Sequence, residues 1–242
     1  MHRPLVLLAV ALACCRESPK SASEPAAASS AFRCVLDGER FAPDVDSEWR
    51  GYTLKTLNRS PRQTLLEGLA RLGEASVVAL DLGAGAGNDV RHLLARGHRV
   101  HAVEPDPFAV AVIEECARQQ ETAEALTVQP ATFEAMRLPE KEFMLVHASL
   151  SLPFTHPEAF PEVWSKIVAS MAEGAVFSGD FFGPRHAWAD NPEMTFLSPE
   201  EVRALFTEHG LRIVRLEEED GPRPLAEGGE ARFHRISVIA RR

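Results

Sequence analysis

The stretch DLGAGAGN, residues 81–88, joins an apolar run to a helical pattern. The run at residues 77–82 is largely apolar, as expected of a parallel strand that is buried on both faces. The three glycines let the backbone turn tightly and approach a ligand without a Cβ in the way. A helix that begins near Asn88 directs free N–H groups and the positive end of its dipole toward this turn. The sequence therefore predicts a strand, a ligand-binding turn and a helix in this order.

The alternation of strands and helices continues along most of the chain. One helix is predicted to start at Pro61, with Ser60 as its cap, and to end at Gly73. Asp106 is predicted to cap a later helix, and a capping box of Ser198 and Glu201 to start another. Further strands are predicted at residues 99–103, 126–129, 143–148, 175–182, 211–216 and 233–240, the last two separated by the polar residues 217–231. This order predicts an α/β fold, a Rossmann-like doubly wound sheet that is mostly parallel with an antiparallel C-terminal edge strand.

An acidic residue at the end of the second predicted strand adds to the glycine turn. Glu104 lies roughly 20 residues after the first glycine, where a carboxylate can accept hydrogen bonds from ribose hydroxyls. A dinucleotide fingerprint places its third glycine where this chain has Asn88. The glycines instead follow the spacing G-x-G-x-G, with Asp81 just upstream. This pattern is similar to the first motif of class I S-adenosylmethionine (SAM)-dependent methyltransferases.

The resemblance implies a cofactor and a set of residues that bind it. In that family the upstream acid lies near the amino group of the methionine moiety, the turn packs on the amino acid part, and the acid after the second strand binds ribose. By position these residues are Asp81, Gly83, Ala84, Gly85, Gly87, Asn88, Glu104 and, beside it, Pro105. Segments starting at Trp49, Ser151, Phe177 and Met194 (WRGY, SLPF, FSGDFFGPRHAW, MTFLSPEEV) also resemble small-molecule methyltransferases of the tellurite-resistance type.

The same resemblance places the adenine and the methyl acceptor. Thr132 or Glu134 lies where the family reads the adenine amino group, and Phe133 either packs on the ring or belongs to the core. Ser149, after the fourth predicted strand, begins the segment that shapes the acceptor pocket and is included among the cofactor-binding residues. Many amine methyltransferases have Asn- or Asp-Pro-Pro-aromatic at this point. This chain has SLPF instead, which weakens the case for an amide or nucleobase nitrogen as the acceptor.

Candidates for a catalytic base follow from the chemistry of methyl transfer. A soft acceptor needs little beyond positioning, whereas a neutral oxygen or a protonated amine needs a general base. Asp180, at the end of a predicted strand, and His186 are the predicted catalytic residues, with His147 and His156 as further candidates. Each has an ordinary structural role as the alternative. Trp188 and Phe182 are candidates for lining an apolar acceptor pocket, with core packing as their alternative.

The composition of the chain indicates which kinds of partner it can bind. Its 242 residues carry a formal net charge of -9 and no block of lysine and arginine, which argues against nucleic acid as a partner. The resemblance to small-molecule methyltransferases implies a small-molecule methyl acceptor as the partner. Cys34 and Cys116 lack metal-ligand spacing, and no metal site is predicted. Cys116 is most simply a small buried hydrophobe, although a disulfide with Cys34 is conceivable in an oxidising compartment.

The N-terminus resembles an export signal. Residues 1–15 combine a basic start with a short apolar run, as in a signal peptide, and resemble a lipoprotein segment with a possible lipid anchor at Cys14 or Cys15. Residues 16–45 are expected to form a disordered linker and an irregular segment, and residues 46–242 the methyltransferase domain. An exported lipoprotein is membrane-anchored and periplasmic, whereas use of SAM favours the cytoplasm. The alternative function is a catalytically degenerate SAM-binding exported lipoprotein.

Overall fold

A single seven-stranded sheet forms the centre of the protein. The structure, a computed structural model, describes residues 32–38, 41, 43–224 and 229–242, so the predicted segment 1–15 lies outside the described residues. The strand order is β3-β2-β1-β4-β5-β7-β6, with the bounds β1 (Val78–Leu82), β2 (Arg99–Val103), β3 (Leu126–Gln129), β4 (Phe143–Ala148), β5 (Met171–Phe182), β6 (Arg212–Pro224) and β7 (Glu230–Arg241). The first five strands are parallel, and β7 and β6 add an antiparallel edge. The predicted fold class is confirmed.

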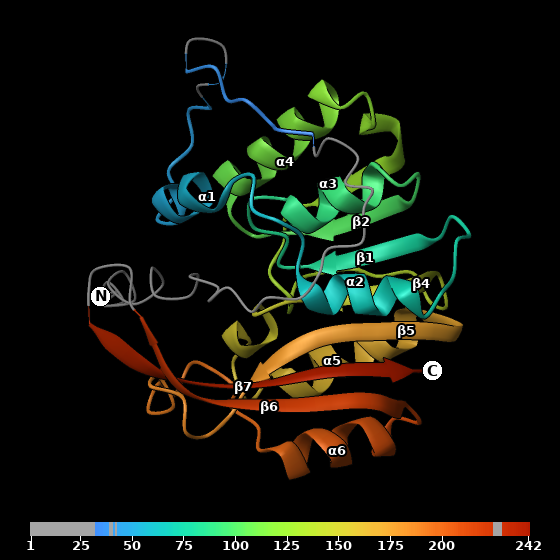
Figure 1. Ribbon diagram of the computed structural model, residues 1–242, viewed down its shortest axis with the longest axis vertical. Helices are drawn as coiled ribbons and strands as arrows, with labels where there is room; N and C mark the ends of the chain where they lie inside the picture. The colour runs from blue at the N-terminus through green and yellow to red at the C-terminus, as the bar shows by residue number, and fades with distance from the viewer. Residues whose placement is uncertain (1–31, 39–40, 42, 225–228) are drawn as a thin grey trace, which may run out of the picture.

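Helices cover both faces of this sheet (Figure 1). They are α1 (Arg50–Thr56), α2 (Gln63–Ala70), α3 (Asn88–Leu94), α4 (Pro107–Gln119), α5 (Phe160–Ser170) and α6 (Pro199–Glu208), with short 3-10 turns η2 (Ala123–Ala125) and η3 (Leu152–Phe154). One apolar core joins the sheet to α5 and α6 around Trp164. A second core joins the other face to α2, α3 and α4 around Leu93. None of the described helices is long and apolar enough to cross a membrane.

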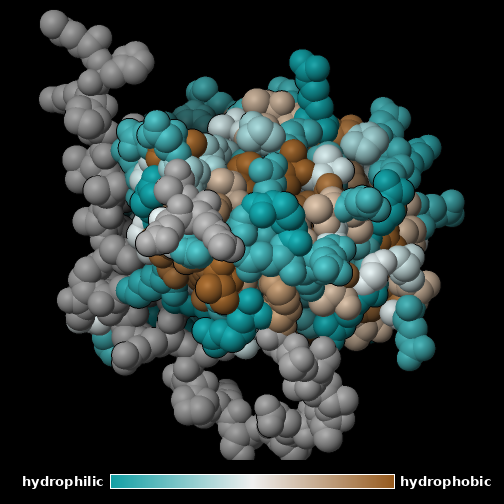
Figure 2. All heavy atoms as spheres, turned by 90° about the horizontal axis from the view of Figure 1, so that it is seen from above, coloured by the Kyte–Doolittle hydropathy of each residue, from teal (hydrophilic) through white to brown (hydrophobic). Residues whose placement is uncertain are grey.

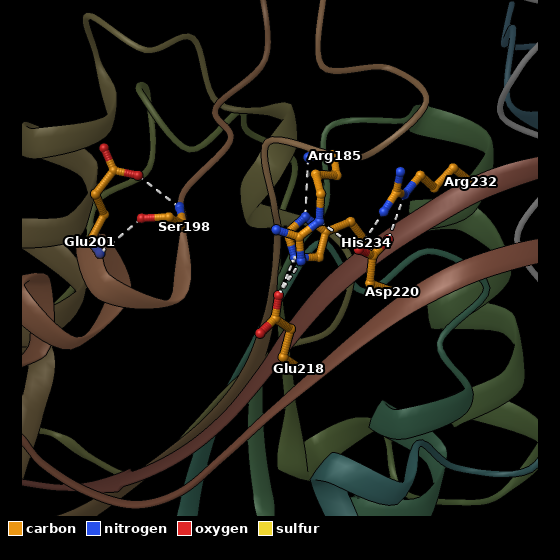
Figure 3. A network of polar contacts seen from close by, with 7 residues as sticks. All are labelled: Arg185, Ser198, Glu201, Glu218, Asp220, Arg232 and His234. Carbon is orange, nitrogen blue, oxygen red and sulfur yellow. Dashed lines mark hydrogen bonds and ion pairs between the residues drawn. The ribbon is translucent and has the colours of Figure 1, made fainter.

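Two helix starts follow the predicted capping chemistry. The Asp106 side chain accepts a hydrogen bond from the backbone N–H of Ala109 over 2.8 Å and opens α4. Ser198 and Glu201 form the predicted capping box at the start of α6, with both reciprocal bonds present (Figure 3).

The start of α2 differs from the prediction. The helix begins at Gln63, and Arg62 before it is extended, with φ -66° and ψ 140°. The backbone N–H of Arg62 donates to Asp89 of α3 over 2.8 Å, which holds the chain straight. This contact between distant segments overrides the local signal of Ser60 and Pro61, so residues 57–62 lie outside the helix.

The last two strands are longer than predicted. Residues 217–231 were expected to separate them, yet β6 continues to Pro224 and β7 starts at Glu230. Cross-strand ion pairs replace the missing apolar pattern, for example Asp220 with Arg232 at 2.7 Å (Figure 3). Pro222 and Pro224 lie in β6, which is the edge strand of the sheet, where prolines are tolerated.

A disulfide joins the N-terminal segment to α4. We use this name for the described residues from 32 to 59, which precede α2. Cys34 and Cys116 of α4 are bonded across 82 residues of sequence, with their Cα atoms 5.2 Å apart. Cys116 is therefore buried as half of a disulfide, which replaces its simpler interpretation as a free hydrophobe. The face seen from above, which includes α4 and this segment, is mainly hydrophilic with scattered hydrophobic patches (Figure 2). Phe108 of α4 packs edge-on against Phe41 of the segment at 5.8 Å.

Candidate functional site

A cavity of about 970 Å³ lies at the carboxyl ends of the parallel strands. Asp81 of β1, Glu104 after β2, Ser149 after β4 and Phe182 at the end of β5 all line it. Ligand crevices of doubly wound sheets form at this edge, where the loops that leave neighbouring strands diverge. Two further walls come from the N-terminal segment around α1 and from the β6–β7 hairpin. Its volume is at the upper end of the range of about 300–1,000 Å³ for small-molecule sites.

The glycine turn forms the floor of the cavity. Gly83 has φ +73°, and a Cβ there would lie 2.4 Å from the Cβ of Ser151. The hydroxyl of Ser151 donates to the carbonyl of Leu82, which holds it against the turn. Gly85 has φ +53° and no atom within 4 Å of the Cβ position, so this part of the turn borders open space. The turn therefore has tight packing behind it and room for a ligand in front of it.

Glu104 holds the shape of this turn. Its carboxylate accepts the backbone N–H of Gly85 over 2.7 Å and that of Asp106 over 2.9 Å. Burial raises the pKa of Glu104, and these two hydrogen bonds partly offset the rise. Each carboxylate oxygen keeps capacity to accept a further hydrogen bond. A ligand with two neighbouring hydroxyls would find both acceptors on one side chain that lines the cavity.

Asp81 is a buried acceptor without a partner. Its Oδ2 atom has no hydrogen-bond partner, although the residue is only 3% exposed and lines the cavity. Burial raises the pKa of Asp81 to about 7; the charge of His147 lowers it, while Asp89 and Glu104 add to the rise. An unpaired buried carboxylate is costly unless a donor is supplied. The ammonium group of an amino acid moiety is a donor of this kind, so the site fits the methionine part of SAM.

His147 and Asp89 form a polar support behind Asp81. His147 is fully buried on β4; its Nε2 lies 3.2 Å from Asp89 Oδ2 and its Nδ1 lies 2.9 Å from Ser178 Oγ. Burial opposes the charged form of His147, but the hydrogen bond and charge of Asp89 raise its pKa overall. Asp89 lines the cavity whereas His147 does not. His147 therefore acts on the cavity only through its neighbours.

The N-terminal segment supplies residues that sequence analysis did not assign. Ser47 donates to Asp106 Oδ2 over 2.6 Å, and Asn88 donates its side-chain N–H to the carbonyl of Thr56 over 2.9 Å. Arg59 also lines the cavity, and its Nη1 atom is buried without a hydrogen-bond partner. These contacts span many residues of sequence, and no local motif marks them.

Most of the predicted cofactor residues meet in this cavity. The lining includes Asp81, Gly83, Ala84, Gly85, Asn88, Glu104, Pro105, Phe133 and Ser149. Gly87 lies behind the turn, where a Cβ would come within 2.8 Å of Ile113, and Thr132 is exposed outside the lining. The cofactor-binding role of every residue in this set, Gly87 and Thr132 included, stays a prediction.

The two predicted catalytic residues lie behind the lining. Asp180 is buried and accepts hydrogen bonds from Ser149 over 2.8 Å and Ser237 over 2.6 Å. His186 stacks on Phe182 with ring centroids 4.2 Å apart. Burial, with the positive charge of a neighbouring histidine, lowers the pKa of His186 to about 4.

Comparisons with known proteins agree with this geometry. Residues 79–174 match the family model described as a methyltransferase domain. A 1,6-didemethyltoxoflavin-N1-methyltransferase from Burkholderia thailandensis, solved with its acceptor and S-adenosylhomocysteine, is 23% identical, with 79% of this chain and 82% of that chain covered and a TM-score of 0.59. TehB from Haemophilus influenzae is 14% identical over 79% of this chain and 66% of that one, with a TM-score of 0.66. A search of curated protein sequences finds no match.

A third structure has the same fold with a different acceptor. Geranyl diphosphate C-methyltransferase from Streptomyces coelicolor A3(2), in complex with Mg²⁺, geranyl diphosphate and S-adenosylhomocysteine, is 14% identical, with 84% and 86% of the two chains covered and a TM-score of 0.59. The sheet and the glycine turn form a Rossmann-like fold, which these solved structures share. The match at residues 79–174 makes this region of the chain similar to methyltransferase domains. These matches lend no support to the degenerate lipoprotein alternative, and the tellurite-resistance branch stays a prediction.

Proposed function

We propose that this chain transfers a methyl group from SAM to a small-molecule acceptor bound in the same cavity. The observation that carries the proposal is the unpaired Oδ2 of buried Asp81, which borders the same cavity as the open side of Gly85 and the Glu104 carboxylate. These three positions offer an acceptor for an ammonium group, room for the amino acid part and acceptors for ribose hydroxyls. Similar structures hold small-molecule acceptors, which supports the acceptor class.

The residues of the chain contribute mainly by binding and orientation. SAM supplies an activated methyl group: the acceptor's lone pair forms the new bond while the carbon–sulfur pair returns to sulfur, leaving S-adenosylhomocysteine. Asp81, the glycine turn and Glu104 would hold the cofactor, and holding two reactants in line accounts for much of the rate of such reactions. Within the described lining no side chain is a histidine, lysine or cysteine. Any general base within this lining would therefore be a carboxylate or Tyr52.

A radiolabelled methyl-transfer screen tests this function. Wild-type protein is incubated with methyl-labelled SAM and thiols, chalcogen oxyanions, amines, carboxylates and aromatic heterocycles in separate reactions. The proposal expects label in at least one acceptor class with wild type and none with Gly85→Val, whose side chain would enter the open space at the turn. Absence of label from every acceptor class would contradict the proposal.

The disulfide supports folding in an oxidising compartment. Bonds of this kind persist where cellular thiols are not kept reduced, and Cys34–Cys116 joins two buried positions of the chain. The proposed compartment agrees with the predicted signal-type segment at residues 1–15. Thiol titration of protein purified from native cells, unfolded without reductant, should find these two cysteines unreactive. Mass spectrometry of the same sample tests the predicted lipid anchor, which a full-length unacylated Met1 species would contradict.

A further inference from the structure

Besides Phe133, which lies beside Gly83, six aromatic side chains line the cavity as one continuous wall. They come from the N-terminal segment, from η3, from the end of β5 with its following loop, and from β7. In order along the wall they are Tyr52, Trp49, Phe154, Trp188, Phe182 and Phe233. Each ring centroid lies between 5.4 and 6.3 Å from the next. We call this set the aromatic wall.

Five of the six rings of the aromatic wall keep exposed surface, whereas Phe182 is buried at 1% exposure. Neighbouring rings are steeply inclined, with 88° between Trp49 and Phe154 and 58° between Phe154 and Trp188, so they meet by their edges and do not bury one another's faces. Phe154 remains 39% exposed, which is unusual for a phenylalanine inside a folded domain. Open aromatic surface that lines a concave site is typical of ligand binding. Aromatic side chains bind a planar ring more strongly than the burial of apolar area alone would predict.

The charged groups beside the wall balance one another. Glu219 is paired with both Arg223 and Arg235, and Arg235 lies 3.9 Å from the buried carboxylate of Asp180. Two positive and two negative groups therefore form an internally neutral cluster. Neither a strongly anionic nor a strongly cationic acceptor would gain a free counter-charge here. At the other end of the wall, Asp46 and Glu48 line the cavity near Trp49 and disfavour an anionic acceptor. An acceptor without net charge fits the balanced end of the wall and avoids this repulsion.

His186 supports the wall from behind. Its ring stacks on Phe182, lies 4.9 Å from the rings of Trp188 and Phe233, and its Nδ1 accepts the backbone N–H of Trp188 over 3.1 Å. The residue is only 5% exposed and does not line the cavity. A single buried imidazole thus fixes three successive rings of the wall.

We propose that the methyl acceptor is a flat, uncharged aromatic molecule that packs against the aromatic wall, and that His186 is a positioning residue of this wall. The inference rests on the proposed function and narrows its acceptor to one chemical class. It predicts that aromatic planarity, rather than hydrophobic size, decides which molecules bind beside the cofactor.

A matched pair of probes tests the proposal by binding alone. Calorimetry on wild-type protein saturated with S-adenosylhomocysteine compares 2-naphthol with decahydro-2-naphthol, which are both uncharged and share one carbon skeleton. We expect 2-naphthol to bind about tenfold more tightly, as stacking beyond area burial allows. Equal affinity of the two probes, or no binding of 2-naphthol to the saturated protein, would overturn the proposal. If S-adenosylhomocysteine itself did not bind, that result would instead contradict the proposed function.

Variants locate the effect in the wall. Trp188→Ala and Phe154→Ala should each remove the preference for 2-naphthol while the affinity for S-adenosylhomocysteine stays unchanged. Phe154 is partly exposed, so its truncation keeps the test available if Trp188→Ala does not fold. Leu54→Ala, on the exposed side of α1 and outside the lining, is the matched control and should change neither affinity.

His186 is tested by rescue. His186→Ala should weaken 2-naphthol binding, and His186→Phe, which keeps a stacking ring, should restore most of it. A preference for 2-naphthol that survives all three alanine variants, at Trp188, Phe154 and His186, would contradict the proposal.

Discussion

Ser47 Oγ donates a hydrogen bond to Asp106 Oδ2 over 2.6 Å, which ties the N-terminal segment to the loop that follows β2. The backbone N–H of Asp106 donates to Glu104, and Glu104 accepts the N–H of Gly85 in the glycine turn. One chain of hydrogen bonds therefore runs from the N-terminal segment to the floor of the cofactor site. The Cys34–Cys116 disulfide anchors the same segment to α4.

Breaking the disulfide should loosen the N-terminal segment, which lines part of the cavity. Reduction, or the double variant Cys34→Ser/Cys116→Ser, is expected to lower the free energy of unfolding by about 2–4 kcal/mol, the usual effect of losing a long-range cross-link. The affinity for S-adenosylhomocysteine should fall at least about fivefold, as for sites coupled through a shared element. Thermal unfolding and calorimetry, each with and without reductant, measure both effects. The double variant should not respond to reductant, and unchanged affinity on reduction would show that the segment does not support the site.

Gly83 should be the least tolerant position of the turn. In Gly83→Ala the left-handed backbone costs about 1–2 kcal/mol, and the clash with Ser151 adds about 1–3 kcal/mol of overpacking. Gly73→Ala is the matched control, because its φ is +78° but no atom lies within 4 Å of the Cβ position. The free energy of unfolding, measured with urea, should therefore be clearly lower for Gly83→Ala than for Gly73→Ala. If both variants lose the same free energy of unfolding, backbone strain alone would explain the destabilisation, and the contact with Ser151 would contribute nothing.

Cofactor affinity should depend on pH through Asp81. Because burial raises the pKa of Asp81 to about 7, its carboxylate is protonated below that pH and cannot pair with an ammonium group. Affinity for S-adenosylhomocysteine should therefore rise roughly tenfold from pH 6 to pH 7.5, as the Asp81 carboxyl loses its proton. Calorimetry across this range measures the profile. Asp81→Asn should bind weakly and lose the rising limb; a variant that keeps the wild-type profile would assign the titration to another group.

Arg59 should recognise the carboxylate of the cofactor's amino acid part. Its buried Nη1 has no hydrogen-bond partner and lines the same cavity as the unpaired Asp81 Oδ2, so the two offer opposite charges to a zwitterion. Arg59→Met should weaken S-adenosylhomocysteine binding about tenfold or more, as for loss of a charged hydrogen bond. Binding of 5′-methylthioadenosine, which lacks the amino acid part, should be unchanged. Equal weakening of the two ligands would point to general damage of the cavity.

The fold and the cofactor loop could be predicted because their signals are local. The glycine turn, the strand that contains Asp81 and the cap at Asp106 each lie within a few residues of sequence, and all three form as expected. The start of α2 could not be predicted, because it depends on the bond between Arg62 and Asp89, 27 residues away. The extended β6–β7 hairpin was missed because ion pairs across it replace the alternation of apolar residues.

The acceptor side of the site depends even more on distant contacts. Trp49 and Phe154 meet at 6.0 Å although more than a hundred residues separate them in the sequence. Phe182 and Trp188 were weighed as pocket residues, but nothing in their local sequence separated that role from core packing. His186 was predicted as a base from its residue type alone, and its position behind Phe182 became visible only in three dimensions.

Binding of SAM through the glycine turn, Asp81 and Glu104 is the basis of the methyl transfer proposed for this cavity. Calorimetric titration of S-adenosylhomocysteine into wild type and Glu104→Ala at pH 7.5 tests it most directly, with thermal unfolding to confirm that the variant is folded. We expect saturable one-to-one binding to wild type and a loss of at least about tenfold in affinity in Glu104→Ala, since charged hydrogen bonds to the ribose are removed. No binding to wild type, or equal affinity in a folded Glu104→Ala, would contradict it.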